Sequence, residues 1–133
     1  MKFIDLDTQY SKIEKNLKKR FETIFTHKQF INGPEVAALE ETLANYVGVN
    51  HCITTANGSD SLFLSLMALG IGKGDEIITS PFTYIATAEM IQLIGATPIF
   101  VDIDSDTFNI NPDEIESKIN ENTKAIMPVS IFG

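Results

Sequence analysis

A short polar turn, Asn57-Gly58-Ser59, holds the residues best suited to binding an anion. It follows an apolar run at 51–55 and opens a segment with helical spacing at 59–69, so its backbone N–H groups should lie at a helix N-terminus. Free N–H groups and the helix dipole attract phosphate there. Gly58 lets a ligand approach the backbone closely, and Ser59 adds a hydroxyl. The alternative is ordinary capping of the helix by Asn57 or Ser59.

A second candidate is the turn at 80–89, which is rich in aromatic and hydroxyl side chains and follows an apolar run at 76–79. Tyr84 stands where a helix over 84–94 is expected to begin. An aromatic ring at that place could cover a flat ligand. The alternative is that the aromatic rings of this turn pack on the sheet.

Three acids at alternate positions, Asp102, Asp104 and Asp106, resemble an oxygen-rich metal site. The calcium-loop pattern then fails, because Thr107 occupies the position of the required glycine and Asp113 that of the late glutamate. We therefore expect a solvated loop and no metal. The glycine-rich loops that usually hold nucleotides, GxGxxG and GxxxxGK[ST], are absent from the sequence.

The elements that must position these turns alternate in type from about residue 50 onward. Helical spacing predicts helices over 9–26, 34–47, 59–69, 84–94 and 112–119, and short apolar runs predict strands at 51–55, 76–79, 98–101 and 124–128. Such alternation indicates an α/β fold with a mainly parallel sheet whose faces are both covered by helices. We expect a helical segment at 1–48, strand–helix alternation at 49–133, and ligands beyond the carboxyl ends of the strands.

The composition of the chain indicates which classes of partner it is unsuited to bind. The chain has 133 residues, a net charge of -8, 44% hydrophobic and 21% charged residues, which suits one globular domain and makes nucleic acid a poor partner. A lone cysteine, Cys52, is expected to be a small core residue. No signal peptide and no apolar run of about 18 residues is present, so we expect a cytoplasmic protein without a membrane partner. One basic cluster is expected to form a solvated helix face: Lys12, Lys15, Lys18, Lys19 and Arg20.

The chain resembles the DegT/DnrJ/EryC1/StrS family of sugar aminotransferases, which belong to the fold-type-I pyridoxal phosphate enzymes. The resemblance rests on seven blocks in the same order and spacing, at 3–6, 30–36, 56–62, 68–77, 81–89, 95–104 and 123–133. The Asn-Gly-Ser-Asp form at 57–60 and the ending Pro-Val-Ser-Ile-Phe-Gly resemble the subgroup that aminates C3 of UDP-linked 3-keto-N-acetylhexosamine uronic acids. Many relatives have His where this chain has Ser130, and many have Thr where it has Ser59.

This resemblance implies the N-terminal part of the large, cofactor-binding domain. It implies that Gly58 and Ser59 hold the phosphate of pyridoxal 5'-phosphate and that Tyr84 stacks on the pyridine ring. The family's Schiff-base lysine and the aspartate that pairs with the pyridinium nitrogen correspond to positions past 133. No catalytic residue is therefore expected within this chain, which should be inactive alone; Lys73 and Lys124 are not assigned that role.

The implied reaction moves an amino group from an amino acid, glutamate in this subgroup, to a keto-sugar nucleotide for polysaccharide synthesis. A homodimer is also implied. Two alternatives stay open at this stage: a non-catalytic truncated remnant or dimerisation module, and a relative that dehydrates or oxidises the sugar.

The family sheet has seven strands in the order 3-2-4-5-6-7-1. Strands 76–79, 98–101 and 124–128 are then neighbours, whereas the only partner of strand 51–55 is the seventh strand. We therefore expect residues 51–55 to lack a ladder partner and residues 124–128 to form an open edge.

Overall fold

The computed structural model describes residues 3–133. The chain falls into two compact units, Met1–Thr54 and Thr55–Gly133. The first unit is helical, and the second contains the sheet.

Helix α1, Leu6–His27, begins where Asp5 accepts a hydrogen bond from the backbone N–H of Thr8 at 3.1 Å. It ends at Lys28, which adopts the left-handed conformation with φ of 59°. The basic cluster expected on its solvated face is exposed, and within it Lys18 pairs with Glu14 at 2.7 Å. The sequence placed this helix at 9–26, so its ends extend slightly further than the apolar spacing indicated.

Helix α2, Pro34–Val47, has the bounds expected from the sequence. Its start is fixed by Gly33, because a Cβ built there would lie 2.2 Å from the carbonyl oxygen of Gln29. Gln29 also donates its N–H to His27 Nδ1 at 3.0 Å, which leaves the ring hydrogen on Nε2 facing both oxygens of Glu35 at 3.2 Å. One imidazole thus joins the end of α1 to the start of α2.

The second unit contains three parallel strands: β1, Glu76–Thr79; β2, Thr97–Phe100; and β3, Thr123–Met127. Their order is β2-β1-β3, so the expected neighbour relations are confirmed. β2 and β3 each begin and end one residue earlier than the apolar runs predicted. β3 is an edge of this sheet, as expected.

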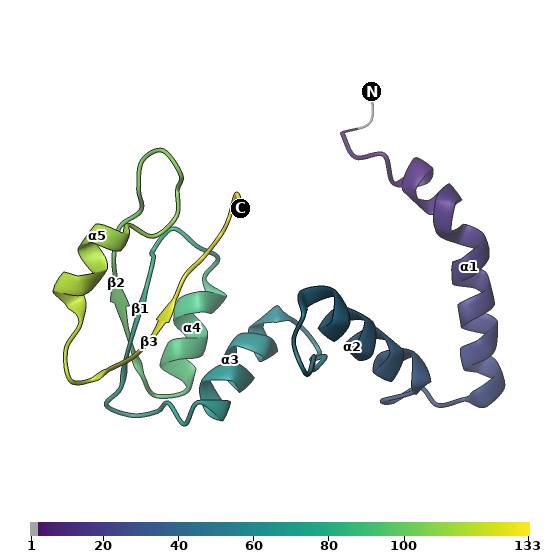
Figure 1. Ribbon diagram of the computed structural model, residues 1–133, viewed down its shortest axis with the longest axis horizontal. Helices are drawn as coiled ribbons and strands as arrows, with labels where there is room; N and C mark the ends of the chain where they lie inside the picture. Colours follow the sequence, from purple (N-terminus) through teal and green to yellow (C-terminus); the bar gives the residue numbers. More distant parts are fainter. Residues whose placement is uncertain (1–2) are drawn as a thin grey trace. The chain divides into compact units, whose positions relative to one another are not determined.

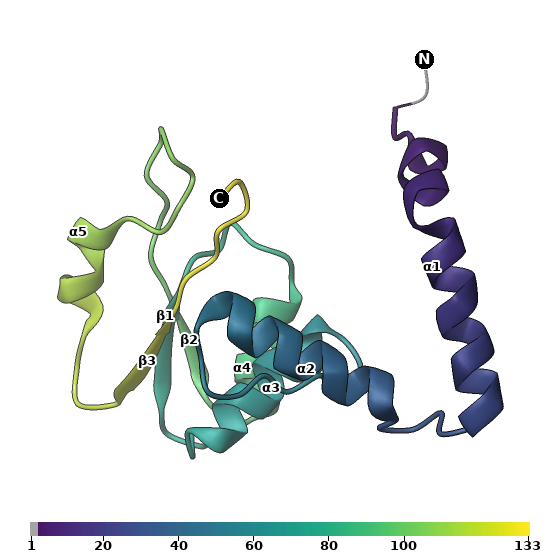
Figure 2. The ribbon, with the colours of Figure 1, turned by 45° about the vertical axis from the view of Figure 1, so that its right-hand side comes forward.

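Helices α3, Gly58–Ala68, and α4, Ala86–Leu93, lie on one side of the strands in both views (Figures 1 and 2). The short helix α5, Pro112–Ile115, continues into a 3-10 turn, Glu116–Lys118, on the other side. The core lies between the sheet and the helix pair α3–α4, and its members are Leu66, Ile71, Ile77, Ile91 and Ala96. Burial of these aliphatic side chains is the main force that holds the helices on the sheet.

The prediction of a strand at 51–55 is wrong. These residues are not part of the sheet, and the side chain of Ile53 is 81% exposed. The backbone N–H and the hydroxyl of Thr54 donate instead to Glu40 Oε1 at 2.8 and 2.9 Å. Cys52, expected in the core, is consequently only half-buried.

Burial differs between the strands of the sheet. β1 is buried along Ile77, Ile78 and Thr79, whereas half-buried and exposed residues alternate along β3, with Ile126 45% exposed. The central strand is covered on both faces, and the edge strand is not.

Candidate functional site

The first turn of α3 shows which polar groups the chain itself satisfies. Asn57 Oδ1 accepts from the N–H of Asp60 at 2.9 Å, and Asn57 Nδ2 donates to Asp60 Oδ2 at 3.0 Å. Asn57 thus caps the helix, and its amide also holds the carboxylate of Asp60. Of the two capping residues considered from the sequence, Asn57 fills the role and Ser59 does not.

This cap leaves the backbone N–H groups of the two residues before Asp60 without a partner in the described part of the chain. Within residues 3–133, the N–H groups of Gly58 and Ser59 have no hydrogen-bond acceptor, and the hydroxyl of Ser59 has no hydrogen-bond partner. The hydroxyl of Ser61, by contrast, is engaged with Thr55 Oγ1 at 2.6 Å. A Cβ built on Gly58 would meet no atom within 4 Å, so the space in front of this backbone is open. The donors at 58–59 therefore suit an external anion.

Tyr84 lies in the turn before α4 rather than in the helix. The helix predicted at 84–94 begins at Ala86, and the carbonyl of Tyr84 accepts from the N–H of Thr87 at 3.1 Å. The ring is 76% exposed and stacks on no other aromatic ring among the described residues. The ring is thus free to cover a ligand. The packing alternative applies instead to Phe82, which contacts Phe108 and Phe132.

The topology brings the two turns to the same end of the sheet. β1 follows α3 and β2 follows α4, and the strands are parallel, so both helices start at the carboxyl ends of the strands. The helices also pack together, since Leu66 of α3 and Ile91 of α4 share the core. The donors at 58–59 and the ring of Tyr84 therefore lie at the edge where open α/β sheets bind ligands.

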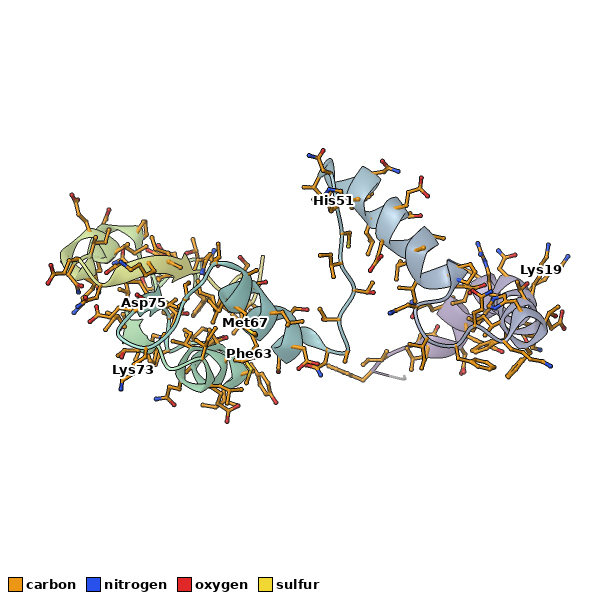
Figure 3. All side chains as sticks on the ribbon, turned by 90° about the horizontal axis from the view of Figure 1, so that it is seen from below. Lys19, His51, Phe63, Met67, Lys73 and Asp75 are labelled. Carbon is orange, nitrogen blue, oxygen red and sulfur yellow. The ribbon has the colours of Figure 1, made fainter. Side chains whose placement is uncertain are left out.

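Two lysines lie at the opposite end of the sheet. Figure 3 shows Lys73 and Asp75 in the turn that leads into β1, at the amino end of that strand. Lys124 stands near the start of β3, where its Nζ donates to the carbonyl of Glu121 at 3.2 Å. Neither position suits a group that must react at the carboxyl edge.

The acidic segment at 102–106 forms a closed turn. Asp104 Oδ1 accepts from the N–H groups of Thr107 at 2.8 Å and Asp106 at 3.0 Å. These hydrogen bonds hold the pKa of Asp104 below its ordinary value of 3.8, and the bond from Thr107 has the largest effect. Across residues 3–133, no group of three His, Cys, Asp or Glu side chains is arranged to hold a metal ion.

The family model of the DegT/DnrJ/EryC1/StrS aminotransferases matches residues 11–133. The chain belongs to this family. A UDP-2-acetamido-2-deoxy-3-oxo-D-glucuronate aminotransferase of Pseudomonas aeruginosa is 48% identical over 133 residues, which cover all of this chain and 37% of that protein. Membership confirms the resemblance stated from the sequence blocks.

Solved structures confirm the fold class. A DegT/DnrJ/EryC1/StrS aminotransferase from Brucella abortus superposes with a TM-score of 0.92 at 41% identity, covering all of this family member and 38% of that chain. NtdA from Bacillus subtilis, whose crystal structure has the cofactor PMP bound, superposes with a TM-score of 0.85 at 34% identity, covering 90% of this chain and 27% of NtdA. The chain thus spans between about a quarter and two fifths of the length of these relatives: 37%, 38% and 27%.

None of the helices in the described part of this family member combines the length and the apolar character needed to cross a membrane.

Proposed function

We propose that this chain supplies the phosphate-binding part of the cofactor site in a pyridoxal phosphate-dependent aminotransferase that acts on a keto-sugar nucleotide. The observation that carries the proposal is the set of open donors at the start of α3, the N–H groups of Gly58 and Ser59 with the Ser59 hydroxyl. Their chemistry suits a phosphate dianion, which accepts several hydrogen bonds at once.

The residues at the carboxyl edge fit the cofactor in shape as well as in charge. Open space in front of Gly58 leaves room for a phosphate against the backbone. Tyr84 presents an exposed ring at the same end of the sheet, suited to stacking on a flat heterocycle. The cap formed by Asn57 and Asp60 ties the nearby carboxylate back to the Asn57 amide.

Pyridoxal phosphate, when bound, supplies an electron sink for bonds at the carbon that carries the amino group. The residues of this chain would bind and orient that group. Gly58 and Ser59 would fix the phosphate end, and Tyr84 would fix the plane of the ring. Holding a reactant in one orientation converts binding energy into rate, so these residues would act through positioning.

The proposal extends to the whole protein of which this chain would form part. We propose a nucleotide-sugar acceptor, an amino-acid donor such as glutamate, a homodimer and a cytoplasmic location. Support for the acceptor comes from the relative in Pseudomonas aeruginosa, which is named for a UDP-linked 3-oxo sugar. We further propose that residues 49–133 carry the site and that residues 1–48 form a helical extension of the domain.

The binding role can be tested by titrating the chain with inorganic phosphate and, separately, with pyridoxal phosphate while recording amide NMR spectra. Both ligands should shift the amide signals of Gly58 and Ser59. Ser59→Ala removes one hydrogen bond to a charged group and should weaken phosphate binding about tenfold.

Ser65→Ala provides the matched control. Ser65 lies in the same helix, is exposed, and bonds only within the helix through the carbonyl of Ser61 at 2.7 Å. Its replacement should leave phosphate affinity unchanged. Ligand-induced shifts confined to residues away from 57–60 would refute the proposed site.

A further inference from the structure

Three phenylalanines from three separate loops meet at the carboxyl end of the sheet. The ring centroids lie 5.9 Å apart for Phe82 and Phe108, 6.4 Å for Phe82 and Phe132, and 5.5 Å for Phe108 and Phe132. The loops follow β1, β2 and β3 respectively, and they extend from the same end of the strands (Figure 1). We call these residues the phenylalanine cluster. All three distances lie within the range of aromatic contacts, and the pair Phe108–Phe132 has the favoured T-shaped geometry.

The cluster is not part of the hydrophobic core. Phe82, Phe108 and Phe132 are 41%, 42% and 71% exposed, so none of the three is buried. Simple core packing is therefore a poor explanation for three rings drawn from three loops. Their contacts do link the loops that follow all three strands.

The loop that carries Phe108 is internally braced. Ile103 and Ile110 form an antiparallel bridge, and Asp104 accepts backbone hydrogen bonds with its side chain and with its carbonyl. Phe108 itself adopts φ of 59°, a conformation that bulky side chains rarely take. Such a conformation persists only where the surroundings hold it, so the loop presents this ring in a fixed place.

The loop that carries Phe82 leads directly to Tyr84. The N–H of Phe82 donates to the hydroxyl of Ser80, which is 1% exposed, at 3.1 Å, and the N–H of Thr83 donates to the carbonyl of Pro81 at 3.0 Å. Tyr84 has no aromatic contact of its own among the described residues. The backbone that carries this ring follows the buried Ser80, is contacted by the cluster at Phe82, and accepts the N–H of Thr87 at the carbonyl of Tyr84.

We propose that the phenylalanine cluster is a positioning device that sets the ring of Tyr84 over the cofactor site; this inference rests on the proposed function. Phe108 and Phe132 hold Phe82 from the neighbouring loops, and Phe82 fixes the turn that presents Tyr84. The three phenylalanines need not touch the cofactor. Their loss should weaken recognition of the pyridine ring and leave recognition of the phosphate unchanged.

The chain offers a direct reporter, because it contains three tyrosines and no tryptophan. Replacing Tyr10 and Tyr46, which lie in the other unit, by Phe leaves Tyr84 as the only tyrosine. Fluorotyrosine labelling of the full chain then gives one fluorine NMR signal, from Tyr84. Phe132→Leu, in the exposed terminal segment, and Phe108→Leu both remove cluster contacts. Phe100→Leu, on β2 and outside the cluster, is the control.

Both cluster variants should shift or broaden the Tyr84 signal without ligand. Both should also raise the pyridoxal phosphate midpoint about threefold, the scale of one aromatic pair, with the inorganic phosphate midpoint at Gly58 unchanged. The control should change neither. An unaltered Tyr84 signal in Phe132→Leu, with amide spectra that show an intact sheet, overturns the inference. Equal loss of phosphate and pyridoxal phosphate binding also overturns it. A wild-type chain without any phosphate response at Gly58 refutes the proposed function, which is a different outcome.

Discussion

Substitution of Gly58 tests whether this glycine is required by the fold or by a bound ligand. In the described structure a Cβ at this position meets no atom within 4 Å, and its φ lies outside the left-handed region. Gly58→Ala should therefore cause no steric strain in the chain. Alanine also restricts the unfolded chain, which stabilises a compatible site by about 0.4–1 kcal/mol.

The expected effect on stability is therefore small and favourable. A gain of about 0.5 kcal/mol should raise the Tm by about 2 °C for a domain of this size. Phosphate binding should change in the opposite direction, because the added methyl group occupies the open space beside the N–H donors of Gly58 and Ser59. We expect a loss of at least about tenfold in affinity, or about 1.4 kcal/mol.

Calorimetry gives the Tm, and phosphate titration followed by amide NMR gives the affinity in the same preparation. Gly70→Ala is the contrasting control, since its φ of 71° makes alanine unfavourable although no ligand is proposed there. That variant should lower the Tm and leave phosphate affinity unaltered. If Gly58→Ala keeps full phosphate affinity, the anion does not approach the backbone at residue 58 and the reasoning fails.

Four further outcomes are expected. Thr79→Val removes the 2.8 Å hydrogen bond to a carbonyl of β3 and should lower the free energy of unfolding by about 1 kcal/mol, measured by urea denaturation against the exposed control Thr97→Val. The hydrogen bond from His27 lowers the pKa of Glu35 from its ordinary value of 4.5. The contribution of this bond to stability is therefore present above pH 4.5 and is lost as the pH falls through the lowered pKa. Glu35→Gln should remove this acid dependence from unfolding monitored by helix content. Borohydride reduction with pyridoxal phosphate should give no stoichiometric adduct at either lysine on the amino side of the sheet, as mass spectrometry of peptides can check. Amide exchange at 51–55 should be fast compared with that of β1, and strong protection there would contradict the absence of a ladder.

The local elements were largely predictable because their signals are short-range. Helix α2 was placed with correct bounds from apolar spacing, a proline at its first position and a glycine after its end. The bounds of β1 were also correct, since a fully buried strand needs apolar residues on both faces. Boundaries moved where tertiary contacts decide, as at Tyr84, which the helical pattern included and the turn before α4 does not.

The candidate site was partly predictable for the same reason. The turn at 57–59 was found because strand, small polar turn and helix are adjacent in sequence, and the cap that leaves Gly58 and Ser59 open is a local motif. The phenylalanine cluster was missed. Its members are separated by 26 and 24 residues and meet only because three parallel strands end at one edge. No local signal distinguishes Phe108 or Phe132 from any other aromatic residue in a loop.

At residues 51–55 the sequence has the pattern of a strand, but the structure has no strand there. The apolar pattern predicts a buried strand, yet a strand exists only with a neighbour whose N–H and C=O groups complete the ladder. In the described structure residues 51–55 have no such neighbour, and Ile53 remains exposed. The N–H of Thr54 donates instead to the side chain of Glu40. Pairing at 51–55 should therefore depend on a partner strand whose backbone groups complete the ladder.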